Sequence, residues 1–120
     1  MGISVYRMAG AVLLLLLGIS AAQAHARLLN AEPAAQSTGE APAKIQLHFS
    51  EELAKKFSSF KLANASGVIV PLTPADSADP KSLAASPATA LMPGQYTVTW
   101  TAVASDDGHK TSGTYVFSVK

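Results

Sequence analysis

The sequence predicts an all-β protein, a small β-sandwich of the Greek-key type. Residues 95–103 and 114–119 each alternate bulky apolar and small polar residues, the period-two pattern of a half-buried strand. Turn residues separate roughly six to eight short segments of this kind along the chain, as is typical of a β-sandwich. After residue 24 no long segment has the 3.6-residue period of a helix, so we expect a fold built from strands.

The first part of the folded chain is expected to hold two strands. Residues 25–33 predict an edge strand that a proline ends, and residues 36–42, rich in small and polar residues, predict a loop. Residues 44–50 alternate so that isoleucine, leucine and phenylalanine share one face. Residues 51–56 then favour a helical turn or an irregular bend.

A hairpin is predicted next. Residues 57–63 and 68–72 are apolar, strand-like segments, and the Asn-Ala-Ser-Gly sequence of residues 64–67 between them has the composition of a hairpin turn. We therefore expect the two segments to pair.

The stretch from residue 73 to residue 90 has the least defined pattern. It is rich in proline, alanine, aspartate and serine, and residues 81–84 and 88–91 are each interpreted as a short strand. Residues 92–94, Met-Pro-Gly, predict a turn into the strand that carries Trp100.

Residues 1–24 have the pattern of a secretory signal peptide. Arg7 provides the positive start, residues 11–19 the apolar segment, and the Ala-Gln-Ala sequence of residues 22–24 fits the small-x-small rule for cleavage. The apolar segment is shorter than the about 20 residues of a comfortable membrane span, although a retained anchor stays open as an alternative. The sequence thus predicts export to the bacterial periplasm, cleavage after Ala24 and one domain over residues 25–120.

Composition narrows the function classes. Cleavage leaves a chain of 96 residues (120 − 24) and removes Arg7, so the 9 basic and 8 acidic residues become 8 and 8. A neutral chain without a basic stripe is a poor match for nucleic acid or an anionic membrane, and neither is predicted as a partner. The chain has no cysteine, no motif of an activated nucleophile and no glycine-rich phosphate loop, so we predict that it is not an enzyme.

Cleavage after Ala24 would make His25 the first residue of the mature chain. An N-terminal histidine offers two nitrogen donors on one residue, the α-amine and the imidazole, and a metal displaces the protons of both at neutral pH. The alternative is coincidence, because signal peptidases tolerate many residues after the cleavage site.

The second candidate feature is the polar loop Ser-Asp-Asp-Gly-His at residues 105–109. It places the Asp107 carboxylate and the His109 imidazole two residues apart between two predicted strands. Asp-Gly-His is also a good turn sequence, and turn formation alone would explain it. The histidine at position 25 is what favours a metal site here.

His25, Asp107 and His109 together form a donor set of nitrogen and oxygen atoms without sulfur. Such a set in a tetragonal plane favours Cu(II), which also heads the affinity order of the divalent metals. Zn(II) would use the same groups in a tetrahedral arrangement. Asp106 is either a competing carboxylate or a residue that orients a ligand through a hydrogen bond.

Other conspicuous residues have structural explanations. His48 lies on the face opposite the apolar residues of its strand and is expected to be a solvated surface histidine, with no part in metal binding. Tyr96, Val98 and Trp100 share one strand face and are predicted to form core.

Three motifs in combination resemble the CopC family of periplasmic copper-resistance proteins. They are the export signal ending before His25, the Ile-Gln-Leu-His-Phe-Ser-Glu sequence of residues 45–51, and Trp100 followed by residues 105–109 and by Gly-Thr-Tyr-Val-Phe-Ser-Val at residues 113–119. The resemblance covers essentially the whole mature chain. It implies an Ig-like or cupredoxin-like sandwich that holds Cu(II) through His25, Asp107 and His109.

The resemblance also implies a function in carrying or sequestering periplasmic copper for copper resistance or homeostasis. A CopD-type inner-membrane protein is the expected partner besides the copper ion, and the mature form is expected to be a soluble monomer. Some members of the family bind Cu(I) through a methionine-rich loop. After cleavage this chain keeps Met92 alone, which favours a carrier of Cu(II) only.

Two alternatives of other classes remain open from the sequence. An N-terminal histidine brace also serves copper oxygenases that attack polysaccharides, although an additional carboxylate ligand would leave little open coordination for oxygen. The other alternative is an Ig-like interaction module that binds no metal.

Overall fold

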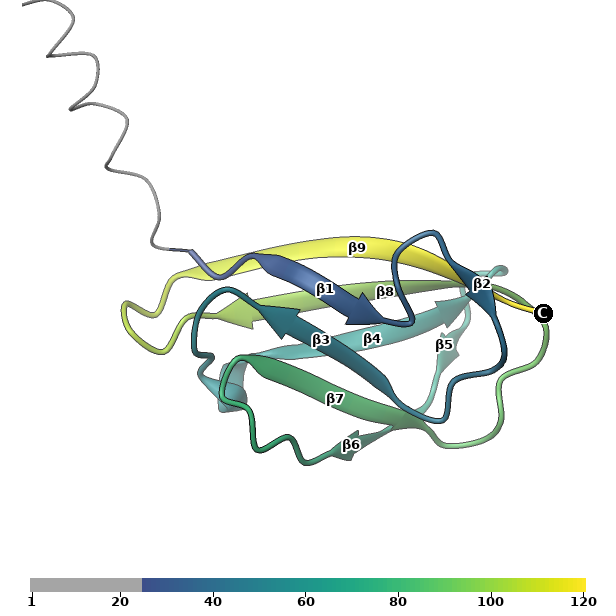
Figure 1. The fold of residues 1–120 in the computed structure, drawn as a ribbon, viewed down its shortest axis with the longest axis horizontal. Coiled ribbons are helices and arrows are strands. Elements are labelled where there is room, and N and C mark those ends of the chain that lie inside the picture. The colour runs from purple at the N-terminus through teal and green to yellow at the C-terminus, as the bar shows by residue number, and fades with distance from the viewer. Residues whose placement is uncertain (1–24) are drawn as a thin grey trace, which may run out of the picture.

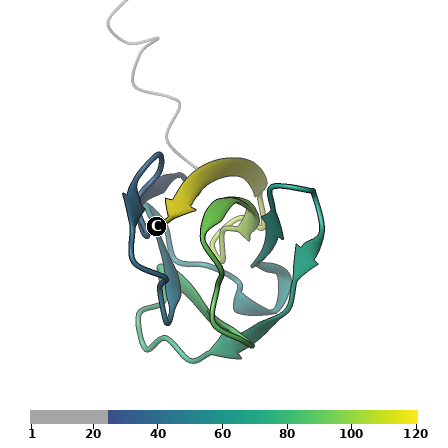
Figure 2. The same ribbon diagram turned by 90° about the vertical axis from the view of Figure 1, so that its right-hand side faces the viewer.

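Strands with alternating apolar residues pair into two stacked sheets in the computed structural model, which describes residues 25–120 (Figures 1 and 2). Within these residues the elements are β1 (Leu28–Glu32), β2 (Thr38–Gly39), β3 (Ile45–Phe49), the 3₁₀ helix η2 (Lys55–Phe57), β4 (Ser59–Asn64), β5 (Ile69–Val70), β6 (Leu72–Ala75), β7 (Ser82–Pro87), β8 (Gly94–Val103) and β9 (Lys110–Val119). The predicted all-β sandwich is confirmed. The signal peptide predicted for residues 1–24 lies outside the described residues.

The chain changes sheet repeatedly, as a Greek-key sandwich requires. One sheet has the order β1-β3-β7-β6 and the other the order β2-β9-β8-β4-β5. All neighbours are antiparallel except β2 and β9, which run parallel. β1 is an edge strand, as predicted. No helix of residues 25–120 combines the length and apolar character needed to cross a membrane.

The inward faces of β3 and β8 form the centre of the core, as the alternation predicts. The inward residues are Ile45, Leu47 and Phe49 of β3 and Tyr96, Val98 and Trp100 of β8. The Phe49 and Trp100 rings meet edge to face with centroids 5.1 Å apart, a favoured aromatic geometry that joins the two sheets.

β8 and β9 form a long hairpin whose loop carries part of the candidate site. Their register runs from Gly94 opposite Val119 to Val103 opposite Lys110, so β9 begins four residues before the predicted start at residue 114. The loop lies at the same end of the sandwich as the start of the described chain, and the C-terminus lies at the other end (Figure 1). The hairpin loop therefore lies beside the start of the described chain, from which it is distant in sequence.

The predicted hairpin around residues 64–67 is confirmed, but its second strand is shorter than expected. β4 pairs with β5 through Leu62 opposite Val70, and the Asn64 side chain accepts hydrogen bonds from the Ser66 and Val68 N–H groups. The prediction of one strand over residues 68–72 is wrong, because Pro71 interrupts it and β6 pairs with β7 in the other sheet. Proline lacks the N–H that would continue the ladder.

Two further predictions are corrected. Residues 36–42 are not entirely loop, since β2 pairs with the end of β9 through Thr38 opposite Ser118. Main-chain groups alone make this pairing, so it needs no apolar alternation. Of the two strands predicted at residues 81–84 and 88–91, only the first is present; it belongs to β7, which runs from Ser82 to Pro87. Residues 88–91 are coil and a bend, although Leu91 is buried in the core.

Candidate metal centre

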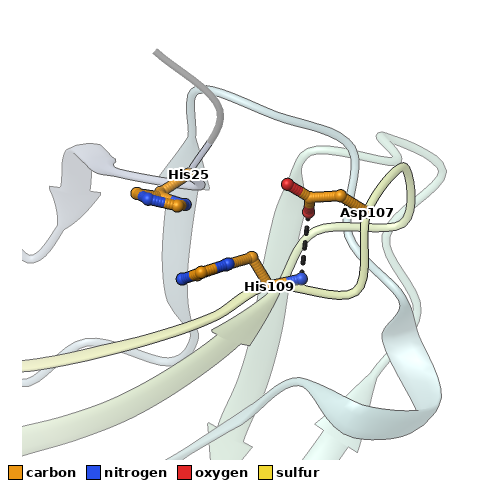
Figure 3. Close-up of side chains that lie close together, drawn as sticks. All are labelled: His25, Asp107 and His109. Carbon is orange, nitrogen blue, oxygen red and sulfur yellow. Dashed lines mark hydrogen bonds between the residues drawn. The ribbon is translucent and has the colours of Figure 1, made fainter. Parts of the chain in front are cut away.

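The structure brings together the three side chains that the sequence analysis singled out. His25, Asp107 and His109 each offer a ligand atom, and these atoms lie within 4.8 Å of one another (Figure 3). All three residues are exposed, His25 at the start of the described chain and the other two in the β8–β9 loop. That these residues hold a metal remains a prediction, whereas their proximity is a property of the fold.

Main-chain hydrogen bonds shape the β8–β9 loop. The Ala104 N–H donates to the His109 carbonyl at 3.0 Å, and the Gly108 N–H donates to the Ala104 carbonyl at 2.9 Å. Gly108 has a φ of 70°, a left-handed conformation that glycine adopts without steric cost. The chain thereby reverses and enters β9 with His109 immediately before the first residue of the strand.

A hydrogen bond inside the loop orients the carboxylate. Asp107 Oδ1 accepts the His109 main-chain N–H at 2.9 Å, and the other carboxylate oxygen turns toward the side of the cluster where His25 lies (Figure 3). The Asp-x-His spacing is what permits this Asx-type bond, which is common in turns. A turn-forming interaction and a ligand role are therefore compatible for Asp107.

The segment that carries His25 is fixed to both sheets by the residues that follow it. The Ala26 side chain is only 1% exposed and belongs to the core, and the Ala26 carbonyl accepts a 2.7 Å hydrogen bond from Thr111 Oγ1 of β9. On the other side, the Ser50 main-chain N–H donates to the Arg27 carbonyl, and the Arg27 main-chain N–H donates to Ser50 Oγ. Both bonds are 2.9 Å long. His25 thus stands on an anchored segment.

The two histidine rings of the cluster face each other. Their centroids are 3.8 Å apart and their planes are inclined by 32°. Nitrogen and oxygen ligands at about 2.0–2.2 Å from a metal such as zinc are at most about 4.4 Å from each other. Since the donor atoms here already lie within 4.8 Å and the side chains are exposed, small rotations would suffice for a common ion, and the donor set fits a borderline divalent metal.

Asp106 and His48 lie outside this cluster. Asp106 is exposed in the β8–β9 loop but is not part of the group of close donor atoms. His48 does lie on the face predicted for it, but the prediction of a solvated side chain is wrong. It is 28% exposed, its Nδ1 lies 2.8 Å from Ser82 Oγ, and its Nε2 lies 3.7 Å from Glu32 Oε1.

A polar network explains why His48 is partly buried. The Ser82 hydroxyl is fully buried and donates to Asp79 Oδ2 at 2.9 Å, which leaves its oxygen to accept a hydrogen bond from His48 Nδ1. Main-chain donation from Lys81, followed by the Ser82 hydroxyl, lowers the pKa of Asp79 below its ordinary value. This network stabilises the junction of β3 and β7. It includes His48, which the sequence pattern predicted to be solvated.

Sequence reasoning missed the two hydroxyl residues that hold the N-terminal segment. Thr111 lies near the start of β9, and Ser50 follows the last residue of β3. Polar residues are common at such positions. Their partners, Ala26 and Arg27, are distant in sequence and have no polar side-chain pattern that points to the contact. No signal in a single sequence identifies such pairs.

Comparison with known proteins gives consistent matches. The model of the CopC domain family matches residues 28–120. Copper resistance protein C of Pseudomonas syringae pv. tomato is 42% identical over 106 residues, which are 82% of this chain and 83% of that protein. The crystal structure of PcoC, described as a methionine-rich copper resistance protein from Escherichia coli, has a TM-score of 0.75 and 44% identity, with 81% of this chain and 100% of that chain covered. The crystal structure of CopC from Methylosinus trichosporium OB3b has a TM-score of 0.73 and 28% identity, with 80% and 94% covered.

Proposed function

This chain belongs to the CopC family, and we propose that it is a periplasmic copper-binding protein that sequesters or carries Cu(II) in copper resistance or homeostasis. The observation that carries the proposal is the convergence of His25, Asp107 and His109 at one exposed end of the sandwich. Copper is here the cargo, and an exposed site suits an ion that must be received and released.

The chemistry of the donors supports Cu(II) as the oxidation state. The cluster supplies two imidazoles and a carboxylate, and cleavage after Ala24 adds the α-amine of His25 as a third nitrogen donor. Imidazole, amine and carboxylate groups in a tetragonal arrangement favour Cu(II) over softer ions. The metal would displace the protons of these nitrogens on binding.

A separate Cu(I) site has little support in this chain. Thioethers and thiolates are the ligands that favour Cu(I). The chain has no cysteine, and of its three methionines two precede residue 24, which leaves Met92 alone in the folded part. This differs from the methionine-rich E. coli relative, and we therefore propose that the protein carries Cu(II) only.

The place of action follows from the export signal. Residues 1–24 have the pattern of a cleaved signal peptide, and export would deliver a mature chain that begins at His25 to the periplasm. We propose that the protein exchanges copper with a CopD-type inner-membrane protein and that it acts as a monomer.

A copper titration with a matched pair of histidine variants tests the proposal. The full chain is exported through its own signal, the N-terminus is verified by mass spectrometry, and Cu(II) affinity is measured by competition together with the EPR spectrum. We expect one Cu(II) per chain and a spectrum of nitrogen and oxygen ligands. His109→Asn should weaken binding by more than the about 10- to 100-fold loss typical of residues that only orient a ligand.

His48→Asn provides the control, because His48 is the remaining histidine of the chain and lies outside the cluster. Its Cu(II) affinity should equal that of the wild type. Absence of stoichiometric Cu(II) binding, a spectrum that requires sulfur, or equal losses in the two variants would refute the proposed site.

A further inference from the structure

A ligand at the end of a chain presents a physical problem. The first residues of a domain are poorly ordered unless something ties them down, and ordering them on metal binding costs conformational free energy. His25 is such a residue, whereas Asp107 and His109 are held by a short loop between two long strands. The affinity of the cluster therefore depends on what orders the residues next to His25.

Ala26 is the residue that fixes the main chain next to His25. Its methyl group is buried among the core residues, and its carbonyl oxygen accepts the 2.7 Å hydrogen bond of Thr111 Oγ1. A side-chain contact and a main-chain contact together fix one peptide unit. The main chain directly after His25 is thus held where it brings the His25 ring against the ring of His109.

The donor of this bond is placed by the strand that also places the ligand. Thr111 follows His109 by two residues on β9 and pairs with Ala102 of β8. Its hydroxyl has one hydrogen, and the Ala26 carbonyl at 2.7 Å is a much closer acceptor than the Ala102 carbonyl at 3.4 Å. The position of the N-terminal segment is thereby coupled to the position of His109.

The contact with the other sheet includes a main-chain bond that no side-chain substitution removes. Ser50 donates its main-chain N–H to the Arg27 carbonyl at 2.9 Å, while its Oγ accepts the Arg27 N–H at 2.9 Å and donates to the His25 carbonyl at 3.4 Å. The Thr111 bond depends on a hydroxyl group. Of the two attachments, it is the one that a single substitution removes cleanly.

We propose that Thr111 is a positioning residue of the metal centre, which holds the Ala26 carbonyl so that His25 is ordered beside His109 before the metal arrives. This inference rests on the proposed function. Preorganisation lowers the cost of binding, because fewer bonds have to be fixed when the ligand is captured. Thr111 touches no metal in this scheme, and its effect passes through Ala26 to His25.

Thr111→Val is the decisive variant, because valine keeps the shape of threonine and lacks the hydroxyl. Cu(II) affinity should fall by about 10- to 100-fold, the range seen when a residue that orients a ligand is lost. The EPR spectrum at one equivalent of Cu(II) should show fewer nitrogen donors. In the metal-free protein, exchange of the Arg27 amide with solvent should accelerate, since the segment is released on one side.

Two further variants and a control make the result specific. Thr111→Ser keeps the hydroxyl and should restore the affinity, the spectrum and the slow exchange. Thr111→Ala is a second hydroxyl-free variant in case valine perturbs the fold. Thr97→Val makes the same change at a half-buried threonine of β8, where no side-chain hydrogen bond is formed within the described residues, and should behave as the wild type.

The outcomes separate the two proposals. A wild-type protein that binds no Cu(II) refutes the proposed function and, with it, the role of Thr111 at a metal centre. A wild-type protein that binds Cu(II), with the same affinity and spectrum in folded Thr111→Val and Thr111→Ala, overturns the role of Thr111 and leaves the proposed function standing. Loss in Thr111→Ser equal to that in Thr111→Val would also overturn it.

Discussion

The three side chains of the candidate centre depend on different parts of the chain for their positions and for their donor atoms. Asp107 and His109 need only the loop between β8 and β9, whose main-chain hydrogen bonds set their positions. In the proposed centre, His25 would offer its imidazole in any form of the protein, but its α-amine would be a donor only if no residue precedes it. Cleavage after Ala24 would therefore decide how many nitrogen donors the proposed centre has.

A single extra residue before His25 is expected to lower the Cu(II) affinity by orders of magnitude while leaving the fold intact. The added residue converts the amine into an amide, and an amide nitrogen is no donor until it is deprotonated, so the chelate is lost. Competition titrations on two preparations, with masses confirmed, measure the difference. Asp106→Asn should cost less, and equal affinities of the two preparations would show that the amine is not a ligand.

A second residue-level contrast concerns two buried tyrosines of the core. The Tyr96 hydroxyl donates to the Met92 carbonyl at 2.7 Å, whereas the Tyr115 hydroxyl is buried without a partner among the described residues. Burial raises the pKa of Tyr115 to about 12 because the phenolate would lose its hydration.

Tyr96→Phe should therefore lower the free energy of unfolding by about 1 kcal/mol, while Tyr115→Phe should leave it unchanged within about 0.5 kcal/mol or raise it. Removing the Tyr96 hydroxyl leaves the Met92 carbonyl without its hydrogen-bond donor. Removing the Tyr115 hydroxyl instead eliminates a buried polar group that has no hydrogen-bond partner among the described residues. Denaturant unfolding of the two variants measures both values. A larger loss in Tyr115→Phe than in Tyr96→Phe would contradict the assignment.

At the level of elements, the β8–β9 hairpin depends on close packing across its register. Gly113 lies opposite Trp100, and a Cβ atom at position 113 would lie 2.7 Å from Trp100 Cζ2 and 2.9 Å from Cε2. The indole is held in turn by Phe49 from the other sheet. The glycine therefore makes room for the aromatic contact that joins the sheets.

Gly113→Ala should lower the free energy of unfolding by about 1–3 kcal/mol, since the buried indole cannot withdraw without strain. Gly39→Ala is the matched control, because a Cβ atom there has no neighbour within 4 Å. Its effect should stay within about 0.5 kcal/mol, as for ordinary surface changes. Denaturant midpoints of both proteins provide the measurement, and similar losses would show that the contact with Trp100 is not the cause.

The junction of β3 and β7 adds a pH-dependent contribution to stability. Hydrogen bonds from Lys81 and Ser82 hold the pKa of Asp79 below its ordinary value of 3.8, so the folded state favours the ionised carboxylate. Such a contribution is present above the unfolded pKa and is lost as the pH falls through the folded pKa.

Asp79→Asn should accordingly lower the melting temperature at neutral pH, and the difference from the wild type should narrow as the pH falls below 3.8. Thermal unfolding followed over that range tests this. Asp76→Asn, an exposed neighbour in the same connection without a hydrogen-bonded side chain among the described residues, should have a smaller effect at every pH. A difference for Asp79→Asn that stays constant with pH would contradict the prediction.

For the molecule as a whole, the candidate centre joins the start of the described chain to the loop before the last strand. His25 begins the described chain and His109 lies immediately before the last strand, and their ring centroids come within 3.8 Å only in the folded state. A metal that uses all three side chains would bind the folded form more tightly than the unfolded chain. Copper binding at the proposed centre would therefore be thermodynamically linked to folding.

Cu(II) at a thousandfold excess over its dissociation constant should stabilise the protein by about 4 kcal/mol. The shift in melting temperature on adding Cu(II) at neutral pH measures the effect, and His109→Asn should show a much smaller shift. An unchanged melting temperature of the wild type under saturating Cu(II) would count against binding to the folded state.

The sequence by itself determined the fold class, the long strands and the three candidate ligands. Period-two alternation is a local property that reports directly which face of β3 or β8 is buried, and it found the core residues Phe49 and Trp100. The donors of the cluster were found because their chemistry is carried by residue type: a histidine after a predicted cleavage site and an Asp-x-His loop. The proximity of these donors is now a structural fact, while their metal stays a proposal.

Only the tertiary structure decided the features that depend on distant partners. The pairing of β2 with β9, the passage of the chain to the other sheet at Pro71 and the contact of His48 with Ser82 are features that no local pattern encodes. The same holds for the bond from Thr111 to Ala26, which is made between a hydroxyl and a main-chain carbonyl 85 residues apart. A carbonyl is present at every residue, so the sequence cannot say which one a hydroxyl will reach until the sheets have been assembled.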